Sequence, residues 1–245
     1  MSSIVYVGHA TVLIDLDGVR LLTDPLLRAR VTFLRRASTV DVDQLRNLDA
    51  VLISHAHYDH LDLPSLERLG SSVPVVVPRG LGRLLEGHAS VVEVVEDEEI
   101  SFGAVTVRAT HADHEGRRHP GRITAPPLGF AISGSLRIYF AGDTDLFPGM
   151  QGLVPDLDLA LIPIWGWGPT LGGGGHLDPR RAAEAVRLLQ PRIAVPIHWG
   201  TYRPLHRGAG AAFLEDPAEA FVREAAIAAP EVQVRVLRPG ERLAL

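Results

Sequence analysis

Three histidines and an aspartate stand within six residues of one another in the segment His55-Ala-His57-Tyr-Asp59-His60. Neutral imidazole and carboxylate are side chains by which proteins hold zinc, manganese and iron. So many ionisable groups at such close spacing repel one another or stay unsatisfied unless a cation holds them. With eleven histidines in 245 residues, chance would produce this pattern in about one such chain in a thousand, which disfavours the alternative of a run of surface histidines. The segment therefore predicts a metal site.

The residues before this cluster determine how its side chains are presented. Residues 50–54 (Ala-Val-Leu-Ile-Ser) form an apolar run typical of a buried strand. Residues i and i+2 of a strand face the same side, so His55 and His57 can bind one ion where the strand ends. Asp59 and His60 fall beyond that end, in a turn, and can face a second ion. The motif is then half of a two-metal site.

Further candidate ligands follow apolar runs later in the chain. His111 and His114 follow one run, and His198 follows another. Asp143 comes after residues 138–141 and a glycine, which permits close approach. Loops at the ends of strands, along one edge of a sheet, are where a fold gathers a site. A lone histidine in such a place is usually a hydrogen-bonded structural residue, so only their joint occurrence indicates ligands.

Short β-rich runs alternate with a few amphipathic segments, without repeats or low-complexity linkers. Asp17-Gly18 between two such runs predicts a tight hairpin. The acidic residues 96–99 lie between predicted strands at 91–95 and 100–109, and we expect a solvated hairpin tip there. Further strands are predicted at residues 73–77, 128–133, 136–141, 160–164, 193–197 and 232–237.

Helices are predicted at residues 63–69, 179–189 and 217–228. The last two begin with proline, and Asp178 and Asp216 are placed to cap them. Many strands with helices between them favour a single α/β sandwich that spans residues 1–245 as one domain.

Composition limits the classes of function. The 245 residues are 46% hydrophobic and 22% charged, as in ordinary globular proteins. A net charge of −5 argues against nucleic acid or an anionic membrane as main partner. The absence of cysteine excludes disulfides, thiolate ligands and a thiol nucleophile. The first residues do not resemble a signal peptide and no apolar run could span a bilayer, so we expect a cytoplasmic protein with a small-molecule substrate.

Five segments together resemble the metallo-β-lactamase fold superfamily: residues 8–11 (Gly-His-Ala-Thr), 22–25 (Leu-Thr-Asp-Pro), 54–61, 140–144 (Phe-Ala-Gly-Asp-Thr) and 196–201 (Pro-Ile-His-Trp-Gly-Thr). The first two are similar to the branch that contains bacterial L-ascorbate-6-phosphate lactonase and the phospholipase D that hydrolyses N-acyl-phosphatidylethanolamine. The resemblance implies a four-layer αββα sandwich, with metals at one edge between the two sheets.

The resemblance also implies seven ligands for two divalent ions: His55, His57 and His114 for the first, Asp59, His60 and His198 for the second, and Asp143 bridging both. Zinc is the metal we expect first, and these ligands suit manganese and iron as well. The choice between His111 and His114 stays open. The branch pattern favours His114, with His111 supporting it from behind.

Other residues near these motifs have two interpretations each. His9 and Asp24 either orient ligand rings or are purely structural. His176 follows a glycine-rich loop and either contacts substrate or is a structural residue. Four arginines in the loop after residues 23–25 suit an anionic substrate, or form a solvated basic loop: Arg28, Arg30, Arg35 and Arg36.

The implied reaction is metal-dependent hydrolysis. A hydroxide that bridges the ions would attack the phosphorus of a phosphodiester or the carbonyl of a lactone or other ester. Asp59 would orient that hydroxide, and His176 would deliver a proton to the leaving group. The alternatives are another hydrolase of the superfamily, such as a β-lactamase or thioesterase, and a metal-binding protein without catalysis. A homo-oligomer also stays open.

Overall fold

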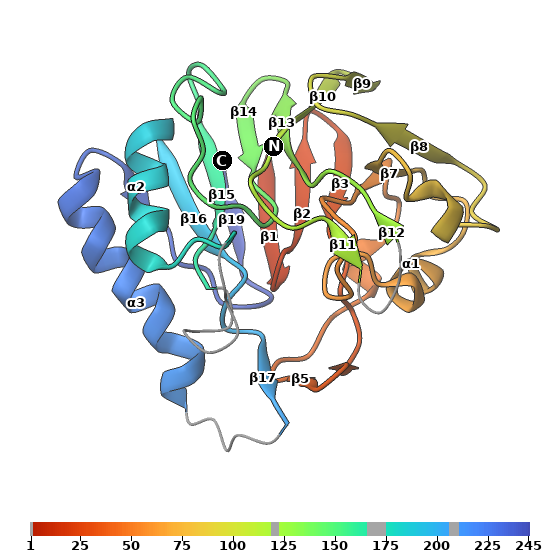
Figure 1. Ribbon diagram of the computed structural model, residues 1–245, viewed down its shortest axis with the longest axis horizontal. Coiled ribbons are helices and arrows are strands. Elements are labelled where there is room, and N and C mark those ends of the chain that lie inside the picture. The colour runs from red at the N-terminus through yellow and green to blue at the C-terminus, as the bar shows by residue number, and fades with distance from the viewer. Residues whose placement is uncertain (1, 119–122, 166–174, 206–210) are drawn as a thin grey trace.

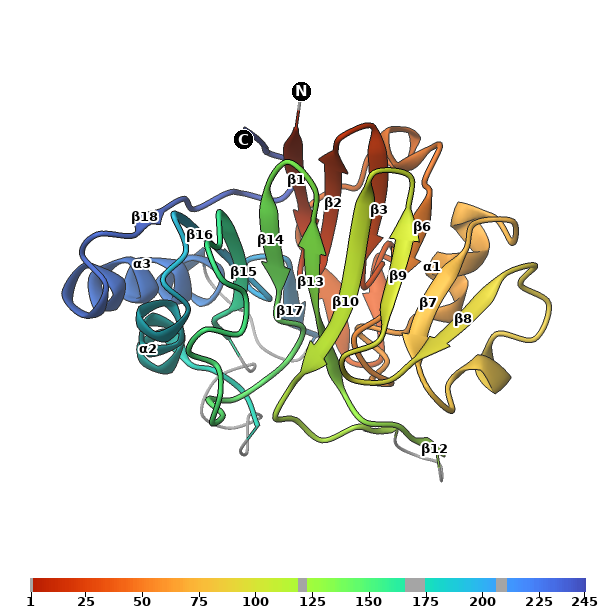
Figure 2. The same ribbon diagram turned by 90° about the horizontal axis from the view of Figure 1, so that it is seen from above.

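The computed structural model describes residues 2–118, 123–165, 175–205 and 211–245. Two sheets lie face to face at its centre (Figures 1 and 2). The first sheet has the strand order β19 (Arg242–Ala244), β1 (Ser3–Gly8), β2 (Thr11–Leu16), β3 (Val19–Thr23), β6 (Ala50–Leu52), β7 (Val75–Pro78) and β8 (Val91–Val94). The second has the order β18 (Gln233–Val234), β16 (Ile193–Ile197), β15 (Leu159–Pro163), β14 (Arg137–Phe140), β13 (Leu128–Ser133), β10 (Val105–His111) and β9 (Glu99–Phe102).

The two sheets repeat one pairing pattern. In the first, the strands from β19 to β3 pair antiparallel and those from β3 to β8 pair parallel. In the second, the strands from β9 to β14 pair antiparallel and those from β14 to β18 pair parallel. The sequence itself shows no repeat, as expected, and the repeated pattern lies only in the order of strand pairings. Both sheets are mixed.

Alternation along the strands separates two hydrophobic layers. In β6, Ala50 and Leu52 face the opposite sheet, whereas Val51 belongs to the cluster on the outer face. Consecutive strand residues point to opposite faces, so a fully apolar strand serves both layers. The first three residues of the predicted run at 50–54 therefore form β6, a strand buried on both faces, and the predicted strand ends two residues early.

Three helices cover the outer faces. The helix α1 (Leu63–Leu69) lies beside the first sheet, and α2 (Pro179–Leu189) and α3 (Ala211–Ala228) lie beside the second (Figure 2). Asp62 and Asp178 cap the first two by accepting hydrogen bonds from Ser65 N and Arg181 N. The result is a sandwich of two sheets flanked by helices, which confirms the predicted αββα fold. No helix among the described residues is long and apolar enough to cross a membrane.

Smaller elements join the main layers. Two short 3₁₀ helices, η1 (Asp43–Leu45) and η2 (Gly82–Leu84), extend the outer cover of the first sheet. A two-stranded ladder joins β11 (Arg117–Arg118) and β12 (Ile123–Thr124). A three-stranded small sheet has the order β17 (Tyr202–Pro204), β5 (Leu34–Arg36) and β4 (Arg30–Val31), and it lies at the lower end of the molecule in Figure 1.

The predicted hairpin is confirmed, because β2 and β3 pair around Asp17 (φ 51°) and Gly18 (φ 84°). Three other predictions are wrong in detail. The strand predicted at 100–109 is two strands, and the acidic residues before it connect the first sheet to the second instead of forming a hairpin tip. The helix predicted from residue 217 begins at Ala211, with Pro217 inside it. The closing strand predicted at 232–237 is only β18, and β19 follows it.

Candidate metal centre

The first group of candidate ligands contains three histidine rings. His57 Nδ1 lies 3.0 Å from His55 Nε2 and 3.2 Å from His114 Nε2. His55 and His57 follow β6 in the first sheet, and His114 follows β10 in the second. Ligand nitrogens bound tetrahedrally to zinc at about 2.0–2.1 Å lie about 3.3 Å apart, close to the spacing seen here. The three rings can thus hold one ion between the sheets.

The structure distinguishes His114 from His111. His111 is nearly half exposed, its Nδ1 pairs with Glu96 Oε2 at 3.2 Å, and its ring meets the edge of Phe147. His114 instead turns its Nε2 toward His57. The structure therefore brings His114 into the cluster, and the expectation that His111 supports it from behind is wrong. In an extended strand end, odd and even residues face opposite sides, which sends the two histidines in different directions.

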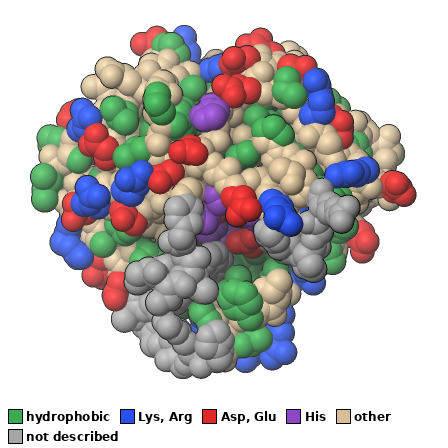
Figure 3. Space-filling model, in the orientation of Figure 1, with side chains coloured by type: hydrophobic (Ala, Val, Ile, Leu, Met, Phe, Trp, Pro, Cys, Tyr) green, Lys and Arg blue, Asp and Glu red, His purple; other side chains and the backbone are tan. Residues whose placement is uncertain are grey.

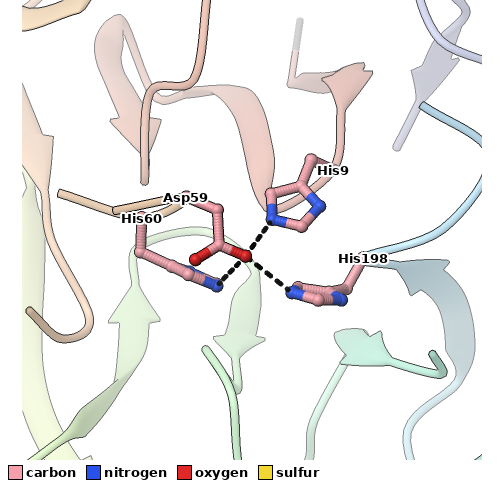
Figure 4. A group of neighbouring side chains, drawn as sticks. All are labelled: His9, Asp59, His60 and His198. Atoms are coloured by element: carbon pink, nitrogen blue, oxygen red, sulfur yellow. Dashed lines mark hydrogen bonds and ion pairs between the residues drawn. The ribbon is translucent and has the colours of Figure 1, made fainter. Parts of the chain in front are cut away.

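The second group gathers around Asp59 (Figure 4). Asp59 Oδ2 lies 3.9 Å from His60 Nε2 and 3.8 Å from His198 Nε2. His9, which follows β1, approaches the same oxygen more closely, with its Nε2 at 3.2 Å. From the sequence, His9 could either orient a ligand or have a purely structural role. The contact with Asp59 supports the first interpretation.

Asp143 stands between the two groups. Its Oδ2 lies 3.2 Å from His60 Nε2 and 3.3 Å from His198 Nε2, and Asp143 also clusters with His114. The residue before it, Gly142, has φ +61°, and a Cβ there would meet the Cβ of Ser54 at 2.7 Å. Only glycine therefore allows the end of β14 to approach the end of β6 so closely. The position fits the bridging role that the resemblance implies.

Four of the histidine rings are held from behind through Nδ1. His198 donates from Nδ1 to the carbonyl of Trp165 at 2.6 Å, and His114 donates to the carbonyl of Gly175 at 2.7 Å. The other two rings use side chains: His55 meets Ser54 Oγ at 2.9 Å, and His60 meets Asp24 Oδ2 at 2.7 Å. Such partners fix the ring orientation and leave Nε2 facing inward, as at metal sites.

Asp24 is fully buried and accepts two hydrogen bonds from Ser54 besides its contact with the ring of His60. Its Oδ1 accepts from Ser54 N at 2.7 Å, and its Oδ2 accepts from Ser54 Oγ. One carboxylate thus connects the end of β3 to the start of the histidine motif. This geometry favours the interpretation in which Asp24 orients a ligand ring.

Arg118 holds the histidine motif from outside, a role that the sequence analysis did not foresee. Its guanidinium donates to the carbonyls of Ala56 and Leu61 and lies 3.8 Å over the ring of Tyr58. The side chain is 8% exposed, so these bonds are largely shielded from water. The only sequence signal was a pair of arginines after His114.

Electrostatics divide the histidines into two kinds. Burial lowers the pKa of His55 well below its ordinary value and that of His114 to about 4. Burial also opposes the charged form of His60, but the carboxylates of Asp143 and Asp59 outweigh it and raise its pKa well above the ordinary value. The pKa of His198 is raised in the same way. Burial alone would raise the pKa of Asp59 and of Asp143. Neighbouring histidines, with His60 first at Asp59 and His198 first at Asp143, hold both pKa values well below the usual range.

A divalent cation fits this donor set. Asp143 Oδ1 is buried and has no hydrogen-bond partner among the described residues, and His60 Nε2 lies next to the other oxygen of the same carboxylate. Leaving buried polar atoms unpaired costs about 1–3 kcal/mol each, which a bound ion would offset. Imidazole and carboxylate donors without sulfur suit zinc, iron and manganese.

His176 lies at the edge of the centre. Its Nδ1 is 3.5 Å from Asp143 Oδ2, and its ring meets that of His114 edge-on. Burial lowers its pKa, so the ring is neutral near pH 7. Most of the glycine-rich loop before it lies outside the described residues. On the molecular face in Figure 3, histidine side chains are visible near the middle, beside acidic ones.

Two of the four arginines proposed to meet an anion have structural roles instead. Arg28 pairs with the buried Asp62, with its Nε 2.9 Å from Oδ2. Arg36 donates to the carbonyls of Leu26 and Val7. The hypothesis of an anion-binding loop therefore reduces to Arg30 and Arg35, which are exposed.

Two facing mixed sheets with a histidine–aspartate cluster at one edge define the metallo-β-lactamase fold. A family model described as "Beta-lactamase superfamily domain" matches residues 19–199. The chain is 33% identical over 97% of its length to a UPF0173 protein of Pyrococcus abyssi, also 97% covered. It is 30% identical to a UPF0173 metal-dependent hydrolase of Methanopyrus kandleri, with 97% of each covered. The chain therefore belongs to the metallo-β-lactamase superfamily and, within it, to the UPF0173 family of metal-dependent hydrolases.

The chain is also similar to proteins outside this family. An N-acyl-phosphatidylethanolamine-hydrolyzing phospholipase D of Caenorhabditis elegans is 32% identical, over 80% of this chain and 63% of that protein. A metallo hydrolase of Ignicoccus hospitalis has a TM-score of 0.73 at 23% identity, covering 99% and 97% of the chains. The diiron β-hydroxylase CmlA of Streptomyces venezuelae has a TM-score of 0.74 at 22% identity, covering 100% of this chain and 54% of that one. Both of these structures share the fold of this chain.

Proposed function

We propose that the protein is a binuclear metal-dependent hydrolase that acts on a phosphodiester or on a lactone or other ester. One observation carries this proposal. Four histidines are fixed through Nδ1 so that their Nε2 atoms converge with two aspartates at the edge between the sheets. A protein that uses its histidines only for packing has no need to orient four rings toward one another.

The proposed ligands form two sets: His55, His57 and His114 in the first, Asp59, His60 and His198 in the second, and Asp143 shared by both. When bound, the two ions supply Lewis acidity and lower the pKa of a water, so that it can attack at neutral pH. Zinc is the metal we propose. Iron is the alternative, because the structurally similar CmlA is a diiron enzyme.

Side chains of the chain itself contribute orientation and proton transfer. His9 donates from Nε2 to Asp59 and so fixes the carboxylate that we propose orients the nucleophile. Burial lowers the pKa of His9 to about 3, so this contact is a hydrogen bond of a neutral ring. His176, also neutral near pH 7, can accept a proton at the edge of the centre and return it to the leaving group.

For the substrate, we place phosphodiesters first. The similarity to a phospholipase D, whose name describes hydrolysis of a phosphodiester lipid, supports that order. The test is a panel of phosphodiesters, lactones, thioesters and β-lactams, assayed on protein of measured metal content with and without chelator. Turnover of β-lactams or thioesters alone would move the protein to another reaction class. Full metal loading without turnover of any substrate would favour the alternative of a metal-binding protein without catalysis.

His57→Ala and Asp143→Ala are expected to abolish both hydrolysis and the stoichiometry of two ions per chain, because each removes a proposed ligand. We expect losses of at least about a thousandfold in kcat/KM. His111→Ala is the matched control, since His111 is an exposed histidine of the same region outside the cluster. Wild-type turnover in either ligand variant would contradict the binuclear mechanism.

A further inference from the structure

The small three-stranded sheet below the metal centre has one buried and one exposed face. Val31, Leu34 and Pro204 are buried and alternate with exposed or half-exposed neighbours. The buried side packs with Tyr202 and, in part, Tyr58 of the histidine motif. Alternation in a strand sends the intervening residues to the opposite face. We call that opposite face, formed by Arg30, Phe33, Arg35, Arg203 and Leu205, the arginine face.

Three arginines stand in register across the arginine face. Arg30 pairs with Arg35 between β4 and β5, and Arg203 pairs with Arg35 between β17 and β5. Like charges directly opposite each other destabilise a sheet. No acidic residue occurs at residues 26–38 or 199–205 to relieve the repulsion locally. Arg30 and Arg35 form no ion pair with any residue that the structure describes. The placement of Arg30 opposite Arg35 is therefore unfavourable for the protein by itself and favourable next to an anion.

Two large apolar side chains lie beside the arginines. Phe33 is 47% exposed and Leu205 is 46% exposed. Leu205 N donates to the carbonyl of Phe33 at 2.8 Å, which continues the register of Leu34 with Pro204 and sets the two residues opposite each other. Phe33 is also at the turn between β4 and β5, next to Thr32 with φ 48°. Opposed residues share a face, so the apolar pair and the arginine row are presented together.

We propose that the arginine face binds the surface of an anionic lipid bilayer. Phe33 and Leu205 would enter the boundary between headgroups and acyl chains, and the arginines would meet lipid phosphates. Hydrophobic side chains are visible next to basic ones at the lower end of the molecule in Figure 3. A nucleic acid would also meet the arginines and could stack on Phe33, but Leu205 offers it no stacking surface, whereas a bilayer can bury both apolar side chains.

The net charge of −5 does not oppose this inference, because the charge is unevenly distributed. Only the arginine face approaches the bilayer, and interactions beyond about 8 Å are screened at physiological salt. The same small sheet packs against Tyr58, between His57 and Asp59, so docking would bring the metal centre close to the lipid surface. The inference does not depend on the proposed reaction, because vesicle binding is measured without turnover.

Sedimentation with vesicles tests the inference. The protein is mixed with vesicles of phosphatidylcholine alone or of phosphatidylcholine with phosphatidylglycerol, at low and high salt. We expect binding to the anionic vesicles that weakens as salt rises. Phe33→Ser should reduce the partition coefficient about tenfold. The double variant Arg30→Gln/Arg35→Gln should reduce it about 25-fold, at about fivefold per arginine.

Matched controls separate this face from general surface effects. Ile227→Ser removes an apolar side chain that is 80% exposed on α3, and Arg46→Gln removes an exposed arginine that lies outside the small sheet and pairs with Asp43. Both should bind vesicles like the wild type, and circular dichroism checks that every variant is folded. Equal binding by all variants, or no binding to anionic vesicles, overturns the proposal. Binding to a DNA oligonucleotide but not to vesicles, or a dimer that Phe33→Ser dissolves without vesicle binding, overturns it too.

Discussion

Burial disfavours the charged form of every histidine in the metal centre, yet carboxylates reverse that effect at two of them. In the first group burial dominates, and the pKa values of His55, His57 and His114 are lowered. In the second group Asp143 and its neighbours outweigh burial, and the pKa values of His60 and His198 are raised. Without metal, the first group therefore favours the neutral form and the second group favours the protonated form.

Metal uptake should consequently release protons at one group and not at the other. A histidine must lose its proton before it binds a metal, so the ion held by His60 and His198 should displace more protons than the ion held by the first group. The ion held by the first group should displace about none. A zinc titration in weakly buffered solution with a pH indicator measures both. His198→Ala should remove the proton-releasing phase, and equal release at both groups would contradict the assignment.

At the scale of elements, the histidine motif depends on Arg118 for its shape. Residues 53–62 carry four proposed ligands without belonging to a helix or strand. Their backbone carbonyls at Ala56 and Leu61 both accept from the Arg118 guanidinium. Hydrogen bonds from a charged donor contribute about 1.5–3 kcal/mol each to stability. This buried charged donor, which bonds to both carbonyls, therefore stabilises the conformation of the loop.

Arg118→Gln should lower the free energy of unfolding by about 2–4 kcal/mol and reduce metal retention, because the carbonyls lose their charged donor. Arg118→Lys should recover only part of the loss, since an ammonium lacks the planar group that lies over the Tyr58 ring and is more strongly hydrated. Denaturant unfolding and metal content after dialysis are the measurements. Arg137→Gln, at an exposed ion pair with Asp156, is the control and should change stability by less than about 1 kcal/mol. An unchanged unfolding midpoint in the glutamine variant would exclude this stabilisation.

Local signals predicted the elements with a complete signature. The helices at 63–69 and 179–189 have aspartate caps and the hairpin has Asp17-Gly18, and each formed as expected. Asp216-Pro217 carries the same helix-start signature, but α3 begins at Ala211. The signature marks a possible helix start that α3 does not use, and Pro217 stands inside the helix at the loss of one backbone hydrogen bond. The core side chains of α3, Ala218, Phe221 and Ala225, all follow Pro217, so their packing does not account for the earlier start.

The metal centre was also predictable only in part. The motif spacing was enough to bring the proposed ligand types together, because strand ends at one sheet edge meet in space. The supporting contacts were not predictable, since they join residues far apart in sequence. His9 and Asp59 are 50 residues apart, and Arg118 is 62 residues from Ala56. No local pattern contains that information, and only the packing of the two sheets supplies it.

At the scale of the whole molecule, the metal centre connects the two halves of the sandwich. His55, His57, Asp59 and His60 follow β6 in the first sheet, whereas His114, Asp143 and His198 follow strands of the second. Each proposed ion therefore takes ligands from both sheets. The hydrophobic layer between the sheets already holds them together, so the ions would add stability to a fold that forms around them.

Removing the ions should therefore lower the melting temperature without unfolding the protein at room temperature. An ion present at a hundred times its dissociation constant stabilises the native state by about 2.7 kcal/mol. For a chain of this length that corresponds to about 5–10 °C for each site. Calorimetry before and after chelation, with metal content checked on the same samples, measures the shift. His57→Ala, which removes a ligand of the first ion, should show a smaller shift on chelation than the wild type. A melting temperature that stays constant while the metal is removed would mean that the ions do not connect the two sheets.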